Sequence, residues 1–85
     1  MYPSRIDADF RRHLKSTDFG IPDEREYPMP DAAHVRAAES YFRYAPDHKK
    51  SILAHRILLK AKKYGVKVGS PVVRDWAKKY RKQMN

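Results

Sequence analysis

The chain has 85 residues, no cysteine and a formal net charge of +9 at neutral pH. This length predicts one domain with a thin core, and the lack of cysteine excludes disulfides, thiolate metal sites and cysteine nucleophiles. No apolar run approaches the roughly 20 residues of a membrane span, and residues 1–10 lack the apolar core of a signal peptide. We therefore expect a single domain, residues 1–85, that works in the cytoplasm without a membrane partner.

The positive charge is concentrated in the C-terminal half of the chain. Residues 1–48 carry a formal charge of −2, whereas residues 49–85 carry +11 and contain a single acid, Asp75. Such an asymmetry favours an acidic partner, and nucleic acid is the commonest one for a basic surface. The alternative is a solvated basic surface that serves solubility.

A short helix is expected over residues 5–15. Ile6, Phe10 and Leu14 recur there at steps of four, which places them on one helix face. Because a helix of this length is marginal in water, we expect its apolar stripe to dock on the rest of the domain.

Residues 16–30 are expected to form a Pro-rich loop. Gly20 and Pro22 interrupt any helical pattern, and the acids that follow keep the segment solvated. The loop also contains apolar residues that either pin it to the core or form an exposed recognition strip: Phe19, Ile21, Tyr27 and Met29.

Three main helices complete the predicted fold, over about residues 31–45, 48–64 and 71–83. Asp31 is placed to cap the first helix, and Gly65 suits the left-handed residue that ends the second. A Ser-Pro pair before the third helix supplies a hydroxyl cap followed by proline at the first helical position. The expected fold class is all-α, a small bundle of these three helices plus the short N-terminal one. The predicted domain thus consists of an N-terminal helix and loop at 1–30 and a helical body with a basic C-terminal helix at 31–85.

The sequence contains none of the patterns that mark an enzyme or a metal site. No two of its histidines are spaced as His-x-x-x-His, and no Gly-rich phosphate loop is present. His34 follows Asp31 by three residues, a spacing typical of helix capping. Ser51 and His55 are one turn apart but have no oriented acid or oxyanion donor beside them. We therefore predict a non-enzymatic protein with no catalytic residue, no metal and no cofactor.

The last predicted helix combines aromatic and basic residues. Trp76 and Tyr80 could stack on bases, but their spacing with Val73 and Ala77 is also that of a core stripe, which is the favoured interpretation in so small a domain. The basic outer face of this helix is then the better candidate for phosphate contacts, continued by lysines of the preceding helix and turn. The predicted nucleic-acid-binding residues are Lys60, Lys63, Lys67, Arg74, Lys78, Lys79, Arg81 and Lys82.

A distinctive motif occupies the middle of the chain. It consists of Ile21-Pro22, Tyr27-Pro28, Asp31, His34-Val35-Arg36, Ala38 and Phe42, followed by a helix that ends in a basic, Gly-containing turn, Ala54 through Lys67. In this pattern the segment from Gly20 to Val68 resembles a small module of phage and prophage proteins, found alone or near head-protease and scaffold segments. The resemblance implies no activity, and it leaves the basic helix after Ser70 outside the module.

Two functions follow as expectations. The first is a phage/prophage-type accessory protein whose basic C-terminal half binds nucleic acid, DNA in preference to RNA, mainly through phosphate contacts. The second is a protein-interaction module, a phage assembly factor or an inhibitor of a host system, that binds an acidic protein surface. In the second case the apolar loop residues would be exposed. The sequence favours no particular oligomeric state.

Overall fold

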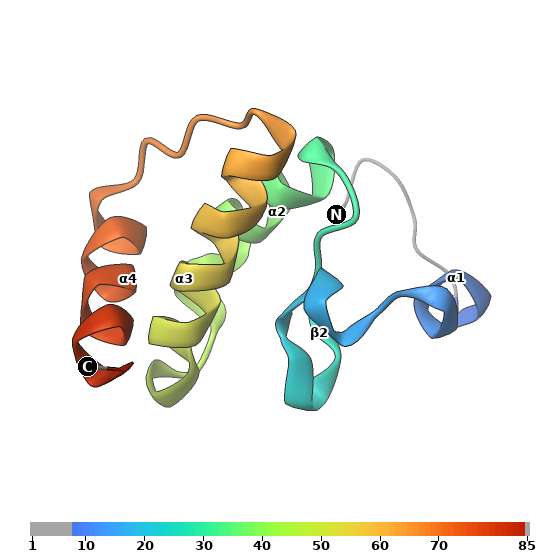
Figure 1. Ribbon diagram of the computed structural model, residues 1–85, viewed down its shortest axis with the longest axis horizontal. Helices are drawn as coiled ribbons and strands as arrows, with labels where there is room; N and C mark the ends of the chain where they lie inside the picture. Colours follow the sequence, from blue (N-terminus) through green and yellow to red (C-terminus); the bar gives the residue numbers. More distant parts are fainter. Residues whose placement is uncertain (1–7, 85) are drawn as a thin grey trace.

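Helices and one small sheet make up the part of the chain that the structure, a computed structural model, describes, residues 8–84 (Figure 1). We write η for a single turn of 3-10 helix. In chain order the elements are α1 (Ala8–His13), η1 (Ser16–Asp18), β1 (Phe19–Ile21), η2 (Pro22–Glu24), β2 (Glu26–Pro28), α2 (Ala32–Tyr41), η3 (Phe42–Tyr44), α3 (Asp47–Tyr64) and α4 (Pro71–Met84).

The prediction of an all-α fold is wrong, because β1 and β2 form a two-stranded antiparallel sheet. Phe19 pairs with Pro28 and Ile21 with Glu26 where a loop was predicted. The chain reverses between the strands through η2 and a left-handed residue, Arg25, at φ 49°. The protein is therefore a small mixed α/β domain, in which the predicted loop is a short hairpin.

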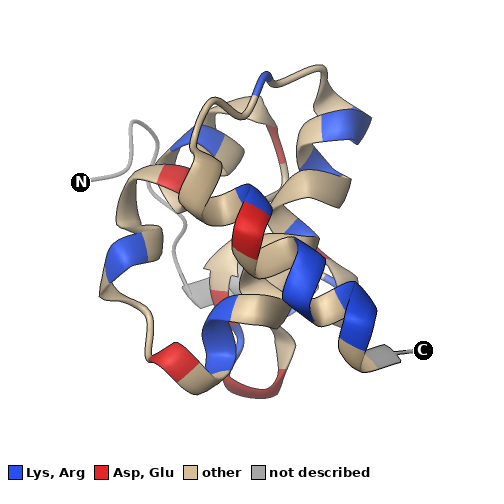
Figure 2. Ribbon diagram, turned by 90° about the vertical axis from the view of Figure 1, so that its left-hand side faces the viewer, with Lys and Arg blue, Asp and Glu red and all other residues tan. Residues whose placement is uncertain are grey.

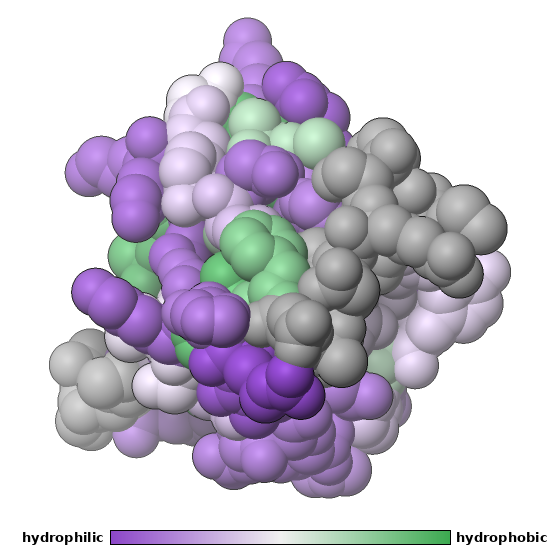
Figure 3. Space-filling model, turned by 90° about the vertical axis from the view of Figure 1, so that its right-hand side faces the viewer, coloured by the Kyte–Doolittle hydropathy of each residue, from purple (hydrophilic) through white to green (hydrophobic). Residues whose placement is uncertain are grey.

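The apolar residues of this hairpin pin it to the body, as one of the two sequence interpretations predicted. Phe19, Ile21 and Met29 are at most 1% exposed, and the Tyr27 hydroxyl donates to the backbone carbonyl of Tyr41 at 2.9 Å. Among the residues coloured in Figure 3, hydrophilic side chains predominate, and an apolar area lies near the centre of this face. The hairpin residues therefore form no exposed recognition strip.

The N-terminal helix ends two residues earlier than predicted, at His13 instead of residue 15. α1 is described from Ala8 to His13, and the predicted start at residues 5–7, with Ile6 of the predicted docking stripe, lies outside the described residues. Phe10 is 46% exposed and Leu14 follows the helix rather than belonging to it. The described part of the predicted stripe is thus not fully buried.

The predicted starts and ends of the larger helices are confirmed at three positions. The Asp31 carboxylate accepts from the backbone N–H of His34 at 2.9 Å and caps α2. Gly65 ends α3 with φ 70°, in the left-handed region that glycine adopts without steric cost. The Ser70 hydroxyl accepts from the backbone N–H of Val73 at 3.3 Å at the start of α4.

α3 is the central element of the fold. It contacts β1, α2 and most of all α4, which runs antiparallel beside it after an extended link at 66–70 (Figure 1). Its core side chains Leu53 and Ile57 are fully buried. From α4, Val73 and Ala77 are each 1% exposed and join the same core cluster as the hairpin residues Ile21 and Met29. One apolar cluster thus connects the hairpin to the C-terminal helix.

Candidate nucleic-acid interface

The orientation of α4 decides which of its charges reach solvent. Val73 and Ala77 face α3, so the residues on the other sides of the helix are exposed. Four of these are basic and near the C-terminal end, and we refer to them as the α4 cations: Lys78, Lys79, Arg81 and Lys82. Figure 2 shows the basic bands along this helix, which is nearest the viewer.

The α4 cations have little to neutralise them. Asp75 is the single acid of the helix. Among the side chains that the structure describes, no carboxylate lies within ion-pair distance of any α4 cation. Their charge is therefore available to an anion in solution.

Arg81 extends this basic surface toward α3. The ring of His55 on α3 packs against the ring of Tyr80 with centroids 4.6 Å apart. Burial lowers the pKa of His55, and the positive charges of Arg56 and Arg81 lower it further. Arg56 and Arg81 thus bring positive charge close to His55, between the two helices.

The residues predicted at the turn between the helices come together with one lysine that was not predicted. Lys67 and Arg74 line a pocket of about 300 Å³ together with Lys62. The guanidinium of Arg74 donates from Nε and Nη2 to the carbonyl of Val68 at 3.2 and 2.9 Å, which fixes it beside the link. Arg74 therefore stabilises the turn and adds positive charge to it.

Lys60 is the one predicted residue that the structure removes from the open basic surface. Its ammonium lies 3.2 Å from the carboxylate of Asp18, and its side chain is 12% exposed. Burial acts to raise the pKa of Asp18, but the backbone N–H of Lys15 and the charges of Lys60 and Lys63 outweigh it, so the pKa is lowered. Asp18 is therefore ionised at neutral pH, and its contact with Lys60 connects η1 to α3.

Trp76 packs on the core without being enclosed by it. The ring is partly buried against the apolar cluster, and the Lys79 ammonium lies 4.3 Å from the ring centroid. The core interpretation is therefore confirmed in part for Trp76, which packs on the cluster but is only partly buried. Tyr80 is also partly buried, and it packs against the ring of His55.

The histidines offer no assembled chemistry in the described part of the chain. His34 is 1% exposed, and its Nδ1 lies 2.7 Å from the Asp31 carboxylate that caps α2. Within residues 8–84, no group of three or more histidine, aspartate or glutamate side chains could hold a metal ion. In the same residues, no helix is both long enough and apolar enough to cross a bilayer.

Sequence reasoning missed Arg56 and Lys62. Arg56 precedes Lys60 by four residues and Lys63 by seven, a spacing that puts all three on one face of α3. This spacing was the available signal. Arg56 was missed because it lies in the most apolar helix, whose neighbouring residues predict a buried core.

Fold and surface together define a small mixed α/β domain with a basic C-terminal helix. Residues 4–71 match a family of unknown function (DUF6582), and because the match covers most of the chain, the chain belongs to this family. No curated protein and no solved structure matches the chain significantly. The family match ends at residue 71, where α4 begins, so the α4 cations lie beyond it.

Proposed function

We propose that the protein is a non-enzymatic phage/prophage-type accessory protein that binds nucleic acid through its C-terminal helix pair. The phage association rests on the motif between Ile21 and Phe42, and the proposed place of action is the host cytoplasm. Binding is mainly to phosphates, with DNA favoured over RNA. The residues proposed to make these contacts are the α4 cations together with Lys62, Lys63, Lys67 and Arg74.

One observation carries this proposal: the α4 cations are exposed and have no carboxylate partner among the described side chains. Surface lysines that serve only solubility are usually interspersed with acids. Here Asp75 is the one acid in 37 residues, from 49 to 85. An array of unpaired cations on a rigid helix is suited to releasing the counterions of a polyanion.

The side chains also indicate how the nucleic acid would be read. Trp76 packs on the core and lies under the Lys79 ammonium, and Tyr80 packs against His55, so both rings are poorly placed to stack on bases. Contacts from Lys and Arg to phosphates position a protein on nucleic acid without reading its sequence. We therefore propose binding with low sequence specificity.

A second candidate is a protein-interaction module that binds an acidic protein surface. The hairpin residues cannot provide the binding surface for such a partner, because Phe19, Ile21 and Met29 are buried. A different surface favours a protein partner. Leu59 on α3 is 54% exposed and Val72 on α4 is 55% exposed, and both helices carry many cations. Apolar contacts from these two side chains would make binding resist moderate salt.

The deciding experiment is binding of the full chain to duplex and single-stranded DNA and RNA between about 50 and 300 mM salt. We expect affinity to fall steeply with salt, with a slope that counts the phosphates engaged. Absence of binding at the lowest salt would contradict the nucleic-acid proposal. In that case an acidic protein partner, captured in a salt-resistant complex, would become the better account.

A further inference from the structure

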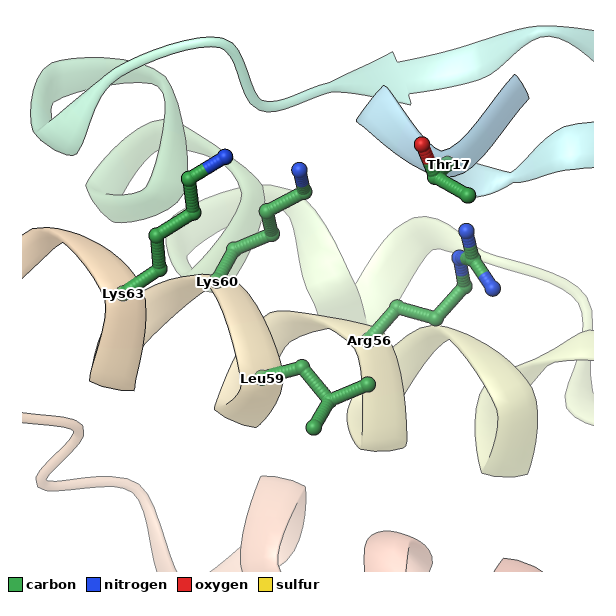
Figure 4. A pocket seen from close by; sticks show the side chains of 5 residues that line it. All are labelled: Thr17, Arg56, Leu59, Lys60 and Lys63. Atoms are coloured by element: carbon green, nitrogen blue, oxygen red, sulfur yellow. The ribbon is translucent and has the colours of Figure 1, made fainter. Parts of the chain in front are cut away.

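A pocket of about 250 Å³ lies between α3 and the η1 segment, and no residue of α4 lines it. We call it the η1 pocket. Arg56, Lys60 and Lys63 extend from one face of α3 toward the segment that carries Thr17, whereas Leu59 points away from that segment (Figure 4). Three basic side chains and one hydroxyl therefore line one small volume, together with Leu59.

Two of the three cations of this pocket, Arg56 and Lys60, are held in place by the fold. Arg56 donates from Nε to the carbonyl of Phe19 at 2.7 Å, which fixes its guanidinium, and among the described residues its terminal nitrogens have no partner. Lys60 is held by Asp18 at 3.2 Å. Lys63 is exposed, and no described carboxylate lies within ion-pair distance of its ammonium. Positioned donors lose less conformational freedom on binding than mobile ones.

The net charge of the η1 pocket indicates the kind of anion that fits it. Arg56, Lys60 and Lys63 contribute three positive charges and Asp18 one negative charge, which leaves a formal +2. A singly esterified phosphate carries about −1.5 to −2 at neutral pH, whereas a phosphodiester carries only −1. The pocket is also smaller than the roughly 300–1,000 Å³ of sites for drug-sized ligands, so it suits a group rather than a whole nucleotide.

We propose that the η1 pocket binds a phosphate monoester, with the Arg56 guanidinium and the Lys63 ammonium on its oxygens and the Thr17 hydroxyl donating to a third. Arginine is the side chain best suited to bidentate phosphate contacts. Two sources share this chemistry, the 5′-phosphate end of a nucleic-acid strand and a free 5′-nucleotide. The first source rests on the proposed function, because the α4 surface would then hold the rest of the strand.

The test compares two single-stranded oligonucleotides of one sequence, one with a 5′-phosphate and one with a 5′-hydroxyl. The wild-type protein should bind the phosphorylated strand about tenfold more tightly, the effect of one additional charge-assisted contact. Lys63→Gln, at an exposed position, and Arg56→Lys, which keeps the charge, should each reduce this preference to about twofold or less. Lys78→Gln on α4 is the matched control and should weaken binding of both strands while keeping their ratio.

The outcomes separate this proposal from the proposed function. Equal affinity of the wild-type protein for the two strands would overturn the proposal for the η1 pocket but not the proposed nucleic-acid interface on α4. If neither strand binds, the proposed function fails. NMR titrations with adenosine 5′-monophosphate and with adenosine then test whether the η1 pocket binds a phosphate monoester. Shifts of the Thr17 and Lys63 amides with the monophosphate alone would support it, and identical responses to the two compounds would overturn it.

Discussion

Gly20 shows how closely the hairpin approaches the central helix. A Cβ added there would overlap the Leu53 side chain and would lie 3.1 Å from Tyr27 Cβ and 3.3 Å from Met29 Cε. Glycine is therefore required in the middle of β1 because of close packing, although its φ is not positive. The sequence interpretation took the same glycine as a helix breaker, which is one reason why the strand was missed.

We predict that Gly20→Ala destabilises the protein by about 1–3 kcal/mol, the usual cost of overpacking a core. Urea denaturation measures this change. Gly69→Ala is the matched control, because a Cβ at position 69 meets nothing within 4 Å; its free energy of unfolding should stay within about 0.5 kcal/mol of the wild type. Equal effects of the two substitutions would contradict the close approach of β1 to Leu53.

Asp18 links the hairpin to α3 through a charge. Its folded pKa lies below 3.8, its value in the unfolded chain, so ionised Asp18 contributes stability above pH 3.8 that is lost as the pH falls through the folded pKa. We predict that Asp18→Asn costs about 1–2 kcal/mol at pH 7 and that the difference from wild type shrinks below about pH 4. Urea denaturation from pH 7 to pH 3 measures both.

The control for this prediction is Asp23→Asn. The Asp23 side chain is 87% exposed and lies 3.7 Å from the ammonium of Lys49, an arrangement worth little in water. Its substitution should change stability little at any pH. A constant difference between Asp18→Asn and wild type down to pH 3 would show that the carboxylate charge is not what stabilises the contact.

The larger helices could be predicted from sequence, because their ends depend on local chemistry. Asp31, Gly65 and Ser70 mark helix boundaries through side-chain caps and a left-handed glycine, and all three do so in the structure. The sheet could not be predicted in this way. Arg25 in its turn and Tyr27 in β2 have φ values of 49° and 58°, conformations that neither residue type signals. Strands of three residues also give too short a pattern to recognise.

The candidate site was predictable to a similar degree. The exposure of the α4 cations follows from the apolar stripe of one helix, which the sequence shows. The pairing of Lys60 with Asp18, 42 residues away, depends on how the hairpin packs on α3. For the same reason the convergence of Arg56 and Lys63 toward Thr17 is visible only in the folded chain.

Trp76 tests which face of α4 is packed. Because the ring is only partly buried, we predict that Trp76→Ala costs about 2 kcal/mol, less than the 3–5 kcal/mol of a fully buried aromatic residue. Nucleic-acid affinity of the folded variant should change by less than about twofold. Val72→Ala on the same helix, at a 55% exposed position, should leave stability within about 0.5 kcal/mol. A stable Trp76→Ala protein with weak binding would instead mean that the ring stacks on bases.

The two ends of the long axis differ in how their charges are paired. α4 lies at one end and α1 with the hairpin at the other, and the family match covers the chain up to the start of α4 (Figure 1). The acids of the hairpin region pair with lysines of α3, as in Asp18–Lys60 and Asp23–Lys49, whereas the α4 cations have no described carboxylate partner. If binding to nucleic acid is electrostatic, it should therefore depend on where a positive charge lies and not only on how many there are.

The most direct measurement is the salt dependence of DNA affinity in two triple variants of equal charge. One replaces Lys78, Lys79 and Lys82 with glutamine; Arg81 is left in place because its charge also acts on His55. The other replaces Arg12, Lys15 and Arg36, which are exposed and lie outside α3 and α4. Circular dichroism and urea denaturation confirm that both variants remain folded.

The first variant should lose affinity, and the slope of log K against log salt should become shallower by about 2–3, close to 0.9 for each lost phosphate contact on duplex DNA. The second variant should change the slope by less than about 0.5, because its cations are not in the interface. Equal losses in the two variants, or a wild-type affinity that does not depend on salt, would contradict a nucleic-acid interface on α4.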